Sequence, residues 1–365
     1  MSFNTALENR TPFSASKYVL PDPHGQEVVL VVVAATFEAA TDGSMELADE
    51  QPVPHDADEY YGDPSFSSLR YEADIALEKP CVDVLINGCA HAPNGRSAAT
   101  LPVQIEVADI RKQLVVTGDR AWRAGPLGAS PSSPEPFETM PIVFERAFGG
   151  IVESGAESRN LVGVGFQGAL SRDPTVRTEV PNVEYPGAHM RSKSDKPQPA
   201  GFGVVGRAWT PRLQFAGTFD QKWKEEQWPL LPLDFDARYY QSAPADQQSR
   251  QLCGGEIVRL INLTPDGEWR FRLPRVHVRM LSLYDNRRVE TQLRLDTVLI
   301  EPDLRRVTLT SRAAIVIRRN RGLLREIVLG YVAEAWIRAR TSGKRFIDYS
   351  GRDGAVMPRV PHYVL

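Results

Sequence analysis

Residues Gly201–Gly206 (GFGVVG) have the G-x-G-x-x-G spacing that lets a backbone turn tightly beneath the pyrophosphate of a dinucleotide. Such a site requires a strand before the glycines and a helix after them, because the N-terminus of that helix holds the phosphates. Pro197 and Pro199 precede the motif and Pro211 follows it, so neither a central strand nor a long helix is expected there. We therefore expect no cofactor, and interpret the glycines as positions where a loop crosses closely packed surface.

The cysteines offer two further patterns with chemical meaning. Gln251–Gly255 (QLCGG) resembles the nucleophile segment of caspases, but the nearest upstream histidine, His189, is separated from it by a proline-rich loop, and Cys253 leads into an expected strand. Cys89 and His91 have a spacing that suits two zinc ligands, yet no second pair of ligands occurs in the chain. We therefore expect neither a nucleophilic cysteine nor a metal site.

Clustered carboxylates are the remaining candidates for catalysis. Asp234 and Asp236, and the group at 56–59, could hold a cation or form an acid pair, but no EF-hand frame surrounds them, so we interpret them as surface residues. The sequence also contains no G-x-S-x-G, no P-loop and no H-E-x-x-H motif. We predict no catalytic residue.

Aromatic side chains are concentrated in one proline-punctuated stretch of about thirty residues. Most of them are expected in the core, and an exposed subset would form contacts with a protein partner. The members are Trp209, Phe215, Phe219, Trp223, Trp228, Phe235, Tyr239 and Tyr240.

The elements that position these residues are mostly strands. The apolar run Val28–Ala35 reads as a buried strand, and Ile257–Leu263, the turn at 264–267 and Trp269–Leu273 form a hairpin pattern. Apolar residues then fall on alternate positions at 289–299 and again at 307–317, which predicts an antiparallel meander. The fold class expected is mainly β, with antiparallel sheets in a sandwich- or meander-like arrangement, long ordered loops and one or two short helices.

Three segments depart from this strand pattern. Periodicity disappears from 124 to 216, where many Pro, Gly and Ser residues predict long ordered loops. Thr218 and Gln221 have the spacing of a capping box, which predicts a short helix that ends at Trp228 before Pro229. Residues 321–340 fit either a helix or strands, and the sequence leaves this open.

Composition limits the partners. The net charge is −3, so we expect neither nucleic acid nor a membrane as a partner, and three scattered cysteines without an apolar leader fit a reducing cytoplasm. The charge is uneven: residues 37–77 hold eleven acidic side chains and one basic, whereas 305–345 hold eleven basic and two acidic. The two stretches either neutralise each other within the fold or present a basic surface to an acidic protein.

Several short stretches, taken together in order and spacing, resemble the DUF2169 family from about Asn9 to Ala314. Members of this family are encoded in bacterial type VI secretion gene clusters. The stretches are DEYYGDPSFSSLRYEAD (58–74), CVDVLINGCAHAPNG (81–95), GDRAWRAG (118–125), MPIVFERAFGG (140–150), KPQPAGFG (196–203), AGTFDQKWKEEQWPLLPLDFDARYYQSAPADQQ (216–248), GGEIVRLINLTPDGEWRFRLP (254–274) and LDTVLIEPDLRRVTLTSRA (295–313).

The resemblance implies a cytoplasmic adaptor or chaperone that binds a toxic effector and loads it onto the VgrG or PAAR spike. It supplies no catalytic residues. We expect a β-rich domain at 1–314 and a basic segment at 315–365 packed on it. The candidate partner-binding residues are Trp223, Trp228, Tyr239, Tyr240, Arg318, Arg319 and Arg321. Two alternatives remain open: an enzyme of unrecognised class that uses the 124–216 segment, and a β carbohydrate-binding module with a row of exposed tryptophans.

Overall fold

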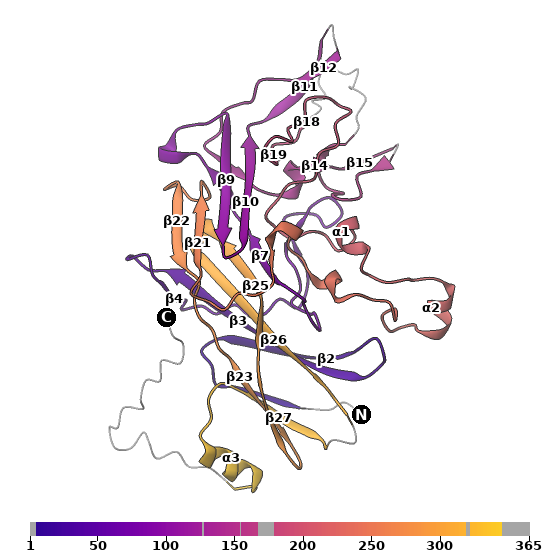
Figure 1. The fold of residues 1–365 in the computed structure, drawn as a ribbon, viewed down its shortest axis with the longest axis vertical. Helices are drawn as coiled ribbons and strands as arrows, with labels where there is room; N and C mark the ends of the chain where they lie inside the picture. Colours follow the sequence, from indigo (N-terminus) through magenta and orange to yellow (C-terminus); the bar gives the residue numbers. More distant parts are fainter. Residues whose placement is uncertain (1–4, 126–127, 154, 167–178, 319–321, 345–365) are drawn as a thin grey trace.

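The apolar run at 28–35 forms the middle of β3 (Glu27–Ala39), a strand of thirteen residues. β3 pairs along its length with β26 (Arg306–Val316) and, on its other side, with β2 (Ser14–Pro21) and β4 (Met45–Leu47). Val28 through Phe37 are buried on both faces of the strand, which explains why the run is continuously apolar rather than alternating. The structure, a computed structural model, describes residues 5–125, 128–153, 155–166, 179–318 and 322–344 (Figure 1).

β3 belongs to a seven-stranded sheet. Its path runs β2, β3, β26, β25 (Arg294–Glu301), β7 (Val82–Ile86) and β20 (Gln248–Ser249), with β4 attached to β3. A second sheet has five strands, in the order β19 (Val183–Glu184), β10 (Ile110–Thr117), β9 (Thr100–Val107), β21 (Ile257–Ile261) and β22 (Glu268–Arg272). Inward residues of both sheets share one apolar core, among them Val31, Ile105, Leu260 and Leu309. The two sheets are therefore the main layers of the fold.

A third sheet of four strands joins the two ends of the described chain. Its order is β1 (Ala6–Asn9), β27 (Leu324–Leu329), β23 (Arg279–Tyr284) and β24 (Arg288–Gln292). β1 and β27 pair in parallel, and α3 (Glu334–Thr341) follows β27. The described part of the expected C-terminal segment thus contributes an inner strand to this sheet.

Short strands and turns occupy the described part of the 124–216 segment, in agreement with the expected loops.

The remaining strands of the whole described chain are short. They are β5 (Glu59–Tyr60), β6 (Leu69–Tyr71), β8 (Cys89–His91), β11 (Arg120–Gly125), β12 (Gly128–Pro131), β13 (Thr139–Pro141), β14 (Phe148–Gly149), β15 (Ile151–Val152), β16 (Gly155–Ala156), β17 (Val164–Gly165) and β18 (Glu179–Val180). Among the described strands, three pairings are parallel, namely β1–β27, β14–β17 and β25–β7; the others are antiparallel.

The mainly β fold class is confirmed; of three local expectations, one is corrected, one is resolved and one is confirmed. Residues 289–299 do not form one strand: the chain leaves β24 at Gln292 and enters β25 at Arg294, in a different sheet. The ambiguous 321–340 segment contains both a strand, β27, and a helix, α3. The hairpin at 257–273 forms as expected, with β21 paired to β22.

The described part of the chain has three α-helices, all short: α1 (Thr210–Leu213), α2 (Gln221–Glu226) and α3. The capping box predicted at Thr218 is wrong, because Asp220 caps α2 by accepting a hydrogen bond from the Trp223 amide at 2.8 Å. Thr218 instead donates to Asp234. Within the described residues, no helix has the length and apolar character needed to cross a membrane.

Candidate functional site

An arm formed by residues 217–236 projects from the side of the molecule and carries α2 (Figure 1). Its base is closed by Thr218, whose amide and hydroxyl both donate to the Asp234 carboxylate at 3.0 and 2.7 Å. Further along, the Gln227 side chain donates to the carbonyl of Pro23 at 2.5 Å. The arm therefore rests on the turn between β2 and β3 as well as on its own base.

The arm exposes large apolar side chains to solvent. Trp228 and Leu233 are each 67% exposed, and Phe219 is 53% exposed. Trp223 is half-buried, because its ring packs edge-to-face on Phe219 with centroids 4.7 Å apart and its Nε1 donates to the Leu230 carbonyl. Such a concentration of exposed apolar residues on a projection is typical of a protein-binding surface.

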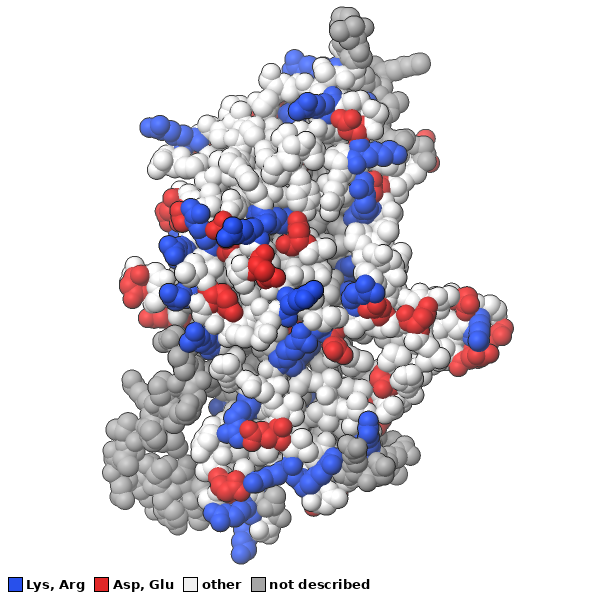
Figure 2. Space-filling model, viewed as in Figure 1, with Lys and Arg blue, Asp and Glu red and all other residues white. Residues whose placement is uncertain are grey.

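Charged residues surround these apolar groups. Figure 2 shows acidic and basic side chains at the end of the arm, and the exposed charged residues on α2 are Lys222, Lys224, Glu225 and Glu226. Both signs are present, so the arm offers a mixed polar rim rather than a field of one sign.

Tyr239 and Tyr240 lie at the base of the arm and are half-buried. They form an aromatic cluster with Phe235, with centroids 5.2 to 6.2 Å apart. The buried Arg212 side chain donates to the Tyr239 carbonyl at 2.8 and 2.9 Å and to Glu72 at 2.7 Å. Burial raises the pKa of Tyr240. These two tyrosines therefore anchor the arm.

The predicted basic component is only partly described. Arg318 is exposed just after β26, and the preceding Ile317 donates its amide to the carbonyl of Glu27, at the end of the same β2–β3 turn that supports the arm. Arg319 and Arg321 lie outside the described residues. The structure thus brings Trp223 and Trp228 together on the arm and places Tyr239 and Tyr240 beneath it.

Sequence reasoning missed Phe219 and Leu233 as exposed residues. Both flank the pair that closes the arm, Thr218 and Asp234, which are sixteen positions apart. A signal was available in the short spacing of Pro229 and Pro232, which excludes a longer helix that would bury this segment.

A buried ionic cluster lies on the outer face of the seven-stranded sheet, and the sequence analysis did not predict it. Lys79 contacts Asp83 at 2.8 Å, and Asp83 also accepts from the Gln241 side chain at 2.6 Å and the Ser242 amide at 2.8 Å. Arg312 pairs with Asp296, and the side chains of all four ionic residues are at most 6% exposed. A charged residue within an otherwise apolar strand, Asp83 in VDVLI, was the available signal.

Beside this cluster is a cavity of about 160 Å³, between the sheet and the segment 52–74. Tyr71 donates to Glu301 at 2.5 Å within it, and burial raises the pKa of Tyr71 to about 12. Burial also raises the pKa of Asp74, with Arg312 opposing the shift. Glu301 is paired with Arg306, Lys79 with Asp83 and Glu72 with Arg212, so these ionic groups of the lining already have charged partners. The 124–216 segment contributes Val204 to the lining of this cavity, and the ionisable lining residues lie outside that segment.

Within the described residues, one ion pair is recorded between the two oppositely charged stretches of the sequence, Arg312 with Asp74 at 4.0 Å. The other paired arginines of 305–345 find partners elsewhere. These pairs are Arg305–Asp266, Arg306–Glu301, Arg325–Asp285 and Arg340–Glu326.

Two of the three glycines of GFGVVG, Gly201 and Gly206, allow close packing. A Cβ at Gly201 would lie 2.9 Å from the Phe144 ring, and one at Gly206 would lie 2.7 Å from Trp209. Those two rings pack edge-to-face at 5.0 Å. No strand enters the motif, and the four-residue α1 begins only at Thr210, so the geometry of a pyrophosphate loop is missing from this described segment.

The cysteines and metal-binding residue types show no assembled site in the described ranges. Cys81, Cys89 and Cys253 are free thiols, and burial raises the pKa of Cys89 to about 12, which disfavours its thiolate. Across the same residues, no group of three or more His, Cys, Asp or Glu side chains is placed to hold a metal ion.

Comparison with known proteins gives one match. A family model described as "Uncharacterized protein conserved in bacteria (DUF2169)" matches residues 24–312, most of the chain. Neither a curated protein nor a solved structure matches.

Proposed function

The chain belongs to the DUF2169 family of bacterial proteins, and from that premise we propose that it is an adaptor that binds a toxic effector and loads it onto the VgrG or PAAR spike of a type VI secretion system. The observation that supports this function is the projecting arm with Phe219, Trp228 and Leu233 exposed at its surface. Its mechanism is contact: the arm covers apolar surface of the partner, and the surrounding charges select that partner.

The two alternatives have less support. A carbohydrate platform uses a row of exposed tryptophans, whereas Trp122, Trp209, Trp269 and Trp336 are buried and Trp228 is the one of the six that is mostly exposed. The enzyme alternative was placed in the 124–216 segment, which contributes Glu145, Arg146 and Glu179 to a pocket of about 440 Å³. Arg146 is already paired with Asp119 there, at 3.1 Å. Both remain predictions that an activity screen and a glycan-binding screen would test.

The test is co-purification of the tagged chain from its native strain, followed by mass spectrometry of the bound proteins. We expect an effector and a spike protein with the wild type, and their loss with Phe219→Ala/Trp228→Ala. An aromatic side chain buries about 150–250 Å², so truncating Trp228 alone should cost about 3 kcal/mol of binding, roughly a hundredfold in affinity.

The matched control is Phe66→Ala, since Phe66 is 78% exposed but lies away from the arm in the sequence and pairs with no aromatic ring in the described structure. This variant should retain the bound proteins. Recovery of no secretion-cluster protein by the wild type, or equal losses in the arm variant and the control, would refute the proposal.

A further inference from the structure

The last strand of the five-stranded sheet, β22, has a free edge within the described structure. Asn262 donates its amide to the carbonyl of Gly267, and Leu273 donates to that of Glu256, so these facing residues form hydrogen-bonded pairs with β21. In an antiparallel ladder such pairs alternate with pairs whose amides and carbonyls point away from the partner strand.

This alternation fixes which groups face outward. Trp269 and Phe271 direct their amides and carbonyls to β21, and their side chains are buried. Glu268, Arg270 and Arg272 therefore direct theirs to the free edge, where no described residue accepts or donates. The edge is a row of unused backbone donors and acceptors.

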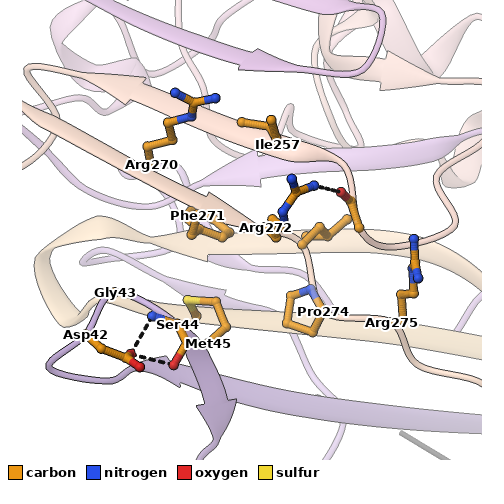
Figure 3. A pocket seen from close by; sticks show the side chains of 12 residues that line it. Asp42, Gly43, Ser44, Met45, Ile257, Arg270, Phe271, Arg272, Pro274 and Arg275 are labelled. Carbon is orange, nitrogen blue, oxygen red and sulfur yellow. Dashed lines mark hydrogen bonds between the residues drawn. The ribbon is translucent and has the colours of Figure 1, made fainter. Parts of the chain in front are cut away.

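A groove of about 740 Å³ runs along this edge (Figure 3). One wall is β22, and the other is the turn Asp42–Met45 that leads into β4. Buried side chains form its apolar base, among them Met45, Phe271 and Leu273. An extended segment lying in the groove would therefore bury its inward side chains against apolar surface.

The groove is rich in positive charge on the β22 side. Arg270, Arg272 and Arg275 line it, and all three are exposed. Arg272 and Arg275 donate to the backbone carbonyls of Gly255 and Gly254, both at 3.2 Å, and none of the three forms an ion pair with a described carboxylate. Asp42, on the opposite wall, is the single acidic lining residue. Carboxylates of a ligand would form ion pairs and hydrogen bonds with these arginines.

We propose that this groove binds an extended segment of a partner protein, with alternating acidic and apolar residues, as an added strand on β22. The proposal rests on the proposed function, because it names a second contact by which the adaptor holds its protein partner. The acidic side chains face Arg270 and Arg272 across the new pair, and the apolar ones enter the gap over Met45 and Phe271.

A second copy of the chain is the competing occupant. Two β22 strands paired antiparallel about a two-fold axis centred on Arg270 would place that residue opposite its own copy, and like charges directly opposite each other are destabilising. Glu268, which could relieve this repulsion, is already held by Arg259 at 2.8 Å. An acidic partner fits the edge better.

The experiment measures binding of a fluorescent eight-residue peptide, (Val-Glu)₄, to the full-length chain by anisotropy at low and high salt. We expect saturable binding that weakens as salt rises, and little binding of (Val-Lys)₄. Arg270→Glu/Arg272→Glu should weaken (Val-Glu)₄ binding about tenfold or more. The control Arg111→Glu/Arg123→Glu makes the same charge change at two exposed strand arginines outside the groove and should bind as the wild type does.

Backbone pairing is tested separately with two methylated peptides. N-methylation of every Glu blocks one edge of the peptide strand, and N-methylation of every Val blocks the other. Strand addition predicts that one of the two peptides loses binding: the Glu-methylated one if the new strand is antiparallel, the Val-methylated one if it is parallel. Equal binding of both would overturn the proposal.

Three further outcomes would also overturn the proposal. The first is no binding of (Val-Glu)₄, and the second is an equal loss of peptide binding in both double variants. The third is failure of the peptide to bind together with concentration-dependent dimerisation that Arg270→Glu/Arg272→Glu abolishes. The first would leave Arg270 and Arg272 as guards against edge-to-edge association. Because Phe219→Ala/Trp228→Ala leaves the groove intact, that variant should bind the peptide normally. Failure of the arm to retain an effector is thus distinguishable from failure of the groove.

Discussion

Replacing Arg312 by methionine should destabilise the protein strongly. The side chain is 4% exposed and contacts Asp296 and, at 4.0 Å, Asp74. Its Nη1 also donates to the carbonyls of Asp74 at 3.0 Å and Ala76 at 3.3 Å, which attaches the segment before β7 to β26. Arg312 therefore connects the acidic stretch of the chain to the seven-stranded sheet.

The magnitude follows from what the substitution leaves behind. Removing one partner of a buried ion pair leaves the other charge buried without a counter-charge, which costs about 3–5 kcal/mol of unfolding free energy. Arg312 contacts two carboxylates, of which Asp74 is 4.0 Å away, so we take the middle of this range, about 4 kcal/mol. Against a total stability of about 5–15 kcal/mol, this is a large fraction.

The assay is urea unfolding followed by tryptophan fluorescence. The double variant Arg312→Met/Asp296→Asn also removes the carboxylate that has lost its partner. Its unfolding free energy should exceed that of Arg312→Met by at least about 1 kcal/mol. The deficit of the single variant should also narrow as the pH falls from 7 to 5, because burial already raises the pKa of Asp74 and loss of the cation raises it further. A folded Asp74 that binds its proton more readily than the unfolded one favours folding at lower pH.

Two results would refute this reasoning. One is a single variant within about 1 kcal/mol of the wild type, since a buried carboxylate without its cation should cost more than that. The other is a double variant no more stable than the single one, which would mean that the ion pair with Asp296 contributes little.

Three further predictions concern packing, ionisation and the arm. Gly206→Ala should cost about 1–3 kcal/mol of unfolding free energy because its Cβ would meet the Trp209 ring, whereas Gly203→Ala, with no contact under 3.7 Å, should cost less; equal costs in urea unfolding would contradict the packing argument. Burial lowers the pKa of Lys112 to about 8, so between pH 8 and 10 the unfolded chain holds a proton that the folded chain has released. The unfolding free energy of the wild type should therefore rise with pH relative to that of Lys112→Met. A difference between the two that does not change with pH in urea unfolding would exclude this. Asp220→Ala should lower the stability of α2 by about 1 kcal/mol and speed hydrogen exchange of the Trp223 amide about fivefold. An unchanged exchange rate would argue against the cap.

The strands with strong local patterns were predictable from the sequence. Val28–Ala35 is too apolar for anything but a buried strand, and the turn at 264–267 joins two alternating runs, so β3 and the β21–β22 hairpin follow directly. The packing role of the glycines at 201–206 was also predictable, because their flanks exclude the alternative use.

The crossing of the chain from one sheet to another near Leu293 was not predictable. The Leu293 amide donates to the carbonyl of Val278, and the chain crosses there from the four-stranded to the seven-stranded sheet. Alternation continues in register through this point, so the period carries no signal of the change. The cap of α2 was missed for a related reason: Asp234, distant in sequence, captures the Thr218 hydroxyl that local rules assign to the helix.

The candidate site was predictable in part. The sequence located the aromatic stretch, but whether a ring is exposed depends on how the arm folds back on the β2–β3 turn, which is a long-range contact. Tyr239 and Tyr240 look equivalent to Trp228 in the sequence, and only the position of Arg212 and Phe235 separates them. The groove beside β22 depends on two strands far apart in the chain.

The parallel pairing of β1 with β27 has a consequence for biosynthesis. A ribosome releases Ala6–Asn9 early, yet their partner strand, Leu324–Leu329, emerges only after nearly all of the intervening chain. β3 likewise waits for β26. Until then β3, the longest of the described strands, lacks one neighbour and exposes an apolar edge, and slow translation between the two strands lengthens this exposure.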